Sequence, residues 1–135
     1  MARFSVASRL SILLLATIAA PASAQMLCSP NALFAVGNKM GMAMADIYRA
    51  PSDNAKPSYL REARSKLMSV KSGLRRAGIN TQDASVDAAL KQIDGYAAKV
   101  GPANLITVQS ATQLGKDVER TLAPVRSEVG RFCPK

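Results

Sequence analysis

The residue types that most often carry protein chemistry are scarce in this chain. Its 135 residues include two Cys and no His or Trp. Without His there is no imidazole for acid–base catalysis and no His ligand for zinc or haem. No spacing selects a carboxylate pair or a Ser–Lys pair, and no glycine-rich phosphate loop follows a strand pattern. We therefore expect no enzymatic activity and no bound cofactor.

The two cysteines, Cys28 and Cys133, stand far apart in the sequence. They lack the CxxC spacing of redox motifs and have no His nearby, so we interpret them as a structural disulfide rather than a reactive or metal-binding pair. In the chain-entropy model, closing a loop of about 106 residues stabilises a fold by roughly 4–5 kcal/mol.

Residues 1–24 have the pattern of a secretory signal peptide. Two arginines accompany an apolar run over residues 10–20, and the Ala-Ser-Ala of residues 22–24 matches the small-x-small cleavage rule. The run has about 11 residues, whereas a membrane anchor needs roughly 20. We therefore favour cleavage after Ala24 over an uncleaved anchor. The mature domain, residues 25–135, keeps 16 basic and 9 acidic side chains, and we expect it in a bacterial periplasm or secreted.

A basic run is the first candidate binding surface. Between residues 56 and 76, seven basic side chains accompany one acid. A surface of this kind suits an anionic envelope component or an acidic protein. The residues assigned to that partner are Arg61, Arg64, Lys66, Lys71, Arg75 and Arg76.

The alternative for these cations is pairing inside the fold. The next predicted helix carries a matching acidic stripe, Asp83, Asp87 and Asp94. Antiparallel neighbouring helices bring like flanks together, which would place Arg75 near Asp83 and Arg64 near Asp94. Exposed pairs of this kind contribute only about 0–1 kcal/mol each. From Arg61 to Arg76 no aromatic side chain interleaves the basic residues, so we expect no nucleic-acid partner.

The first predicted helix is apolar over an unusually wide arc. Beside its core positions it carries a flank of aromatic, small and apolar residues, which could be a homodimer face or an apolar-ligand groove. The alternative is close packing against neighbouring helices. The flank comprises Phe34, Gly37, Gly41, Met44, Ala45 and Tyr48.

Three methionines in the same helix, Met40, Met42 and Met44, suggest Cu(I) binding, because thioethers select soft metals. Residues two apart on a helix point about 200° apart, so Met42 cannot join the other two. A third ligand would have to be Met68 from the next helix. Methionine more often fills gaps in a core, and we favour that interpretation.

Hydrophobic spacing predicts the elements that position these residues and the positions that face the core. Those core positions are Leu33, Val36, Met40, Ala43, Ile47, Leu60, Ala63, Leu67, Val70, Leu74, Ala77, Val86, Leu90, Ile93, Ala97, Val100, Val108, Ala111, Gly115, Val118, Leu122 and Val125. Helices are expected over residues 30–49, 58–77 and 83–100, and a fourth from about residue 103 that kinks or breaks at Pro124. Gly78 should end the second helix. The fold class is therefore all-α, a four-helix up-and-down bundle. Four antiparallel helices place both termini at one end, where a Cys28–Cys133 bridge needs them.

These features together predict a small exported, non-catalytic helical binding module with a basic surface for an anionic envelope component or acidic protein. The alternative is an apolar-ligand-binding or dimerising bundle that uses the flank of the first helix. Cu(I) binding is a weaker hypothesis. A purely structural envelope protein without a dedicated ligand is the remaining class.

Overall fold

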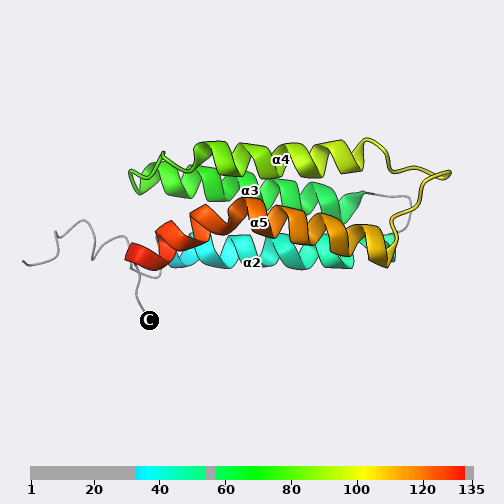
Figure 1. Ribbon diagram of the computed structural model, residues 1–135, viewed down its shortest axis with the longest axis horizontal. Coiled ribbons are helices and arrows are strands. Elements are labelled where there is room, and N and C mark those ends of the chain that lie inside the picture. Colours follow the sequence, from blue (N-terminus) through cyan, green and yellow to red (C-terminus); the bar gives the residue numbers. More distant parts are fainter. Residues whose placement is uncertain (1–32, 54–56, 133–135) are drawn as a thin grey trace, which may run out of the picture.

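The computed structural model describes residues 33–53 and 57–132, and these form a four-helix bundle (Figure 1). The helices are α2 (Leu33–Arg49), α3 (Ser58–Arg76), α4 (Asp83–Ala97) and α5 (Val108–Phe132). A short 3₁₀ turn, η1 (Ala50–Asp53), follows α2. The predicted all-α class is confirmed. The predicted signal peptide and both cysteines lie outside the described residues.

Consecutive helices pack side by side and run in opposite directions (Figure 1). Helix α2 packs against α3 and α5, and α4 packs against the same two helices from the opposite corner. The start of α2 and the end of α5 therefore lie at the same end of the bundle (Figure 1). The bundle leaves each helix one face that no other helix of the four covers.

The core lies along the predicted apolar positions of each helix. On α2 and α3 every predicted core position is buried except Ala77, which is partly buried. The buried set on these two helices comprises Leu33, Val36, Met40, Ala43, Ile47, Leu60, Ala63, Leu67, Val70 and Leu74. Leu90, Ala97 and Val100 of the third predicted helix are partly buried against this core. Periodicity alone therefore located most of the core.

Gly78 ends α3 as predicted, with φ of 75°, a conformation that favours glycine. The Gly78 N–H donates to the Arg75 carbonyl at 2.9 Å, and the Ile79 N–H donates to the Leu74 carbonyl at 2.8 Å. These two bonds form a Schellman motif. Ile79 is buried, so the turn also anchors the start of the α3–α4 loop to the core.

The fourth helix begins later than predicted, at Val108 rather than near residue 103. The reason is a reciprocal cap between Thr107 and Ser110. The Ser110 N–H donates to the Thr107 hydroxyl at 3.0 Å, and the Thr107 N–H donates to the Ser110 hydroxyl at 3.1 Å. Val108, a predicted core residue, is consequently 72% exposed in the first turn, whereas Ile106 of the preceding loop is buried.

Helix α5 continues through Pro124 to Phe132, so of the two outcomes predicted at this proline, a kink or a break, the break is wrong. Pro124 cannot donate a hydrogen bond to the Arg120 carbonyl. Both residues are exposed, and water can therefore bond to that carbonyl. Leu122 and Val125 on either side are buried, which holds the helix against the bundle across the proline.

Candidate functional site

The basic flank of α3 faces the acidic flank of α4, and the two form a row of ion pairs. Arg64 Nε donates to Asp94 Oδ1 at 2.8 Å, and Lys71 Nζ donates to Asp87 Oδ1 at 2.7 Å. The Arg75 Nη2 atom lies 2.9 Å from Asp83 Oδ2. Both pairs named from the sequence are present, with a third between them. Three of the six candidate cations therefore pair with a carboxylate of α4.

Lys66 lies on the other flank of α3 and pairs with Asp46 of α2. The Asp46 side chain is 6% exposed and that of Lys66 is 19% exposed, so this pair is far more enclosed than those facing α4. Glu62 of α3 also lies 3.8 Å from the Lys66 ammonium. Sequence reasoning treated Lys66 as a free surface cation. The missed signal was Asp46, the single acid of α2, placed directly before the core residue Ile47.

Arg61 and Arg76 are the candidate cations that remain without an ion pair among the described residues. Fifteen residues separate them, which is about 22 Å along a helix. Serines occupy much of the exposed surface between them, at positions 65, 69 and 72. The six cations therefore do not form one concentrated basic patch.

The predicted apolar flank of α2 divides into an exposed part and a buried part. Phe34 is 67% exposed and Tyr48 is 45% exposed. No described atom lies within 4 Å of where a Cβ would stand on Gly37 or Gly41. Met44 is 7% exposed and belongs to the core, which removes it from this surface. We use "the α2 outer face" for the residues of this flank that remain exposed or half-buried, which are Phe34, Gly37, Gly41, Ala45 and Tyr48.

The close helix approaches occur at glycines other than those on the α2 outer face. A Cβ on Gly73 of α3 would stand 2.7 Å from Val36 Cγ2, and a Cβ on Gly115 of α5 would stand 2.7 Å from the Tyr48 ring. These two glycines let α3 and α5 approach α2 from its two flanks. Gly37 and Gly41 have no such role among the described helices.

The methionines do not converge on one point. Met40 and Met44 lie in the core, whereas Met42 and Met68 are 41% and 49% exposed. The Met68 sulfur accepts a hydrogen bond from Arg64 Nη1 at 3.1 Å, and Arg64 itself pairs with Asp94 of α4. Met68 therefore lies on the α3 flank that faces α4, away from α2. This geometry offers no support for a three-thioether copper site.

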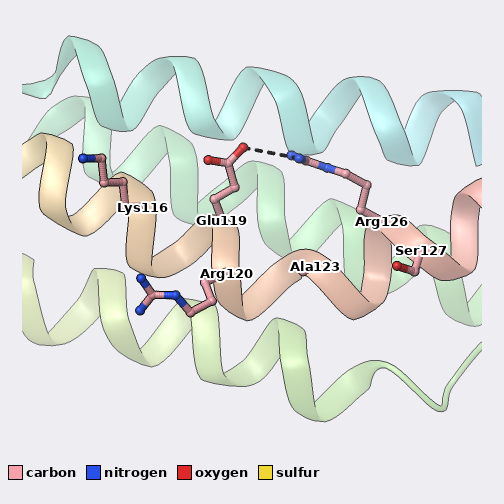
Figure 2. Close-up of a pocket in the computed structure, with 6 residues that line it drawn as sticks. All are labelled: Lys116, Glu119, Arg120, Ala123, Arg126 and Ser127. Atoms are coloured by element: carbon pink, nitrogen blue, oxygen red, sulfur yellow. Dashed lines mark hydrogen bonds and ion pairs between the residues drawn. The ribbon is translucent and has the colours of Figure 1, made fainter.

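A shallow depression runs along the outer surface of α5 (Figure 2). One helix supplies its whole lining, which comprises Lys116, Glu119, Arg120, Ala123, Arg126 and Ser127. Glu119 and Arg126 point toward the α2 side and form an ion pair at 3.3 Å (Figure 2). Lys116 and Arg120 point elsewhere, so no group of side chains converges on a ligand here.

Two further observations restrict the chemistry of the described helices. Among the residues that the structure places, no three His, Cys, Asp or Glu side chains gather where they could hold a metal ion. None of the helices in 33–53 and 57–132 has the length and apolarity needed to cross a membrane. Comparison of the chain with protein-family models, curated proteins and solved structures gives no match.

Proposed function

We propose that this protein is a small, non-catalytic helical binding module whose binding surface is the α2 outer face. The observation that carries the proposal is an uncharged, aromatic-flanked helix face exposed on a strongly basic chain. Exposed apolar surface costs solvation free energy, and a contiguous patch of it commonly marks a docking site. Pairing of the α3 cations inside the fold favours this face over the basic run.

The ion pairing of the carboxylates with basic side chains supports a non-catalytic function. Asp46, Asp83, Asp87 and Asp94 each lie against a basic side chain that belongs to a neighbouring helix. General acid–base catalysis by a carboxylate needs a group within reach of a substrate in a concave site. The depression on α5 is shallow and its acid is paired with Arg126.

Native mass spectrometry of the purified protein tests the binding face. We expect the wild-type chain to carry an added mass, either a second copy or an apolar molecule, and Phe34→Glu to lose it. Ala88→Glu is the matched control, because it adds the same charge to an exposed position of α4. A wild-type protein detected only at the mass of the monomer, as expected for Phe34→Glu, would overturn the proposal.

An anionic partner is the second candidate, supported by cations that the fold leaves unpaired. Within the described residues these are Lys39, Arg49, Arg61, Arg76, Lys91, Lys99 and Lys116. Such a surface would bind vesicles rich in phosphatidylglycerol, weakly and less at high salt. Replacing Arg61 and Arg76 together by Glu should reduce binding. Unchanged binding and unchanged salt dependence would remove this candidate.

We also propose export with cleavage after Ala24 and a Cys28–Cys133 disulfide. The common end of the bundle that holds the start of α2 and the end of α5 supports the disulfide (Figure 1). Denatured intact mass of protein recovered from a bacterial periplasm tests both, since the disulfide lowers the mass by about 2 Da until it is reduced. An uncleaved chain contradicts the export signal, and a mass unaffected by reduction contradicts the disulfide.

A further inference from the structure

The α2 outer face is symmetric about its own centre. Taking Gly41 as the midpoint, an aromatic residue stands seven positions before it (Phe34) and seven after it (Tyr48). A small residue stands four positions before it (Gly37) and four after it (Ala45). At 100° per residue, all five fall within an arc of about 80°, and no charged residue lies in that arc. Reversing the direction of the helix reproduces the same arrangement of residue types.

From this symmetry we propose that the occupant of the α2 outer face is a second copy of the same chain, packed antiparallel about a two-fold axis through Gly41. A two-fold interface must be complementary to itself, because the same patch serves both subunits. In this register Gly41 meets Gly41 of the second copy, Gly37 meets Ala45, and Phe34 meets Tyr48. The small residues at the centre allow the helices to approach closely, and the aromatic pairs close the two ends. The inference rests on the proposed function and names its partner.

Helix α5 adds charge complementarity to a second copy packed in this way. The Tyr48 ring lies against Gly115, so α5 borders the α2 outer face, and the two helices run antiparallel. Glu119 and Arg126 stand seven residues apart on the α5 flank beside α2 (Figure 2). Antiparallel packing brings like flanks together. A two-fold axis reverses the order of these two charges in the second copy, so Glu119 of one copy can meet Arg126 of the other.

The overall charge predicts how salt acts on this association. The chain carries 18 basic and 9 acidic side chains, so two copies repel each other at long range. Added salt screens that repulsion without weakening apolar contact. It also screens the exposed Glu119–Arg126 contacts, but exposed pairs of this kind contribute little, so salt should strengthen the dimer. Binding to an anionic surface responds in the opposite direction. The sign of the salt effect thus separates self-association from the second candidate function.

Sedimentation of the full chain over a wide concentration range, at low and high salt, is the first test. We expect a monomer–dimer equilibrium that shifts toward dimer at high salt. Gly41→Glu and Gly41→Lys should each weaken association by roughly a hundredfold or more, because each places like charges opposite one another at the axis. An equimolar mixture of the two variants should associate again, since only a Gly41–Gly41 contact pairs the opposite charges.

Gly95→Glu and Gly95→Lys are the matched controls, because Gly95 is also an exposed helical glycine with no described atom within 4 Å of a Cβ. We expect both to dimerise like the wild type. A wild-type chain that stays monomeric at every concentration and salt would overturn the second copy as occupant. So would charged Gly41 variants that fail to associate on mixing. In that case the native mass spectrum separates the two proposals. If it shows a bound apolar molecule that Phe34→Glu loses, the α2 outer face is still the binding surface, but its occupant is that molecule and not a second copy.

Discussion

The basic run of α3 and the outer face of α2 differ in how much of each the fold covers. Four of the six candidate cations of α3 lie against carboxylates of α2 or α4. On α2, by contrast, Phe34 is exposed, and no described side chain covers Gly37 or Gly41. The charged region was the more conspicuous candidate in the sequence. In the fold much of its charge is neutralised by neighbouring helices. The apolar region is the one left without a partner inside the described bundle. A row of charges on a helix therefore predicts a binding surface only when no adjacent flank carries the opposite charge.

The largest effect is expected where the charged region is most enclosed. Asp46→Leu should lower the free energy of unfolding by about 2–4 kcal/mol, because it leaves Lys66 partly buried with Glu62 as its remaining acid. Combining Asp46→Leu with Lys66→Met should recover most of that loss, since no unpaired charge remains. Urea unfolding monitored by circular dichroism measures both. A loss below about 1 kcal/mol in the single variant would place this pair with the exposed ones.

Glycine substitutions should distinguish a glycine that meets a neighbouring helix from one on the α2 outer face. Gly73→Ala should lower the free energy of unfolding by about 1–3 kcal/mol, because the new Cβ would meet Val36 in the core. Gly41→Ala should raise the free energy of unfolding of the monomer by about 0.5–1 kcal/mol, because alanine favours the helix and the site is open. Thermal unfolding at low protein concentration compares the two. A destabilising Gly41→Ala would show that the α2 outer face is covered within one copy.

The exposed pairs between α3 and α4 should have the smallest effects. Asp94→Asn should lower the free energy of unfolding by less than about 1 kcal/mol, because the Arg64 and Asp94 side chains are 44% and 49% exposed. The difference should shrink further at high salt. Urea unfolding at two salt concentrations checks this. A loss comparable to that of Asp46→Leu would remove the distinction between the two flanks of α3.

Local patterns were sufficient for much of the fold. The heptad spacing located the buried residues of α2 and α3, and Gly78 located the end of α3. Two predictions about α5 were wrong, one on where the helix starts and one on whether it breaks at Pro124. The Thr107–Ser110 cap moved the start of α5, and its Thr-x-x-Ser signal was present but unused. At Pro124, packing of Leu122 and Val125 outweighed the missing hydrogen bond.

The candidate site was predicted less completely than the fold. The α3–α4 pairs followed from flank geometry, because both stripes lie on neighbouring helices joined by a short loop. The Lys66–Asp46 pair joins residues 20 positions apart across a different helix contact, and no spacing rule indicated it. Met44 was placed on the flank of α2 because its helical position lies at the border of the core. Only packing against the other helices decided on which side of that border it falls.

Sequence alone specified which segments are helical, where most of the core lies, and that the whole carries excess positive charge. These properties depend on the 3.6-residue period, on caps and on composition, all of which are local or additive. The tertiary structure alone decided which cations are neutralised, which glycines admit a neighbouring helix, and which face of α2 is left open. Those outcomes depend on which flanks meet and at what level along the axes, and a helix's own periodicity contains no information about either.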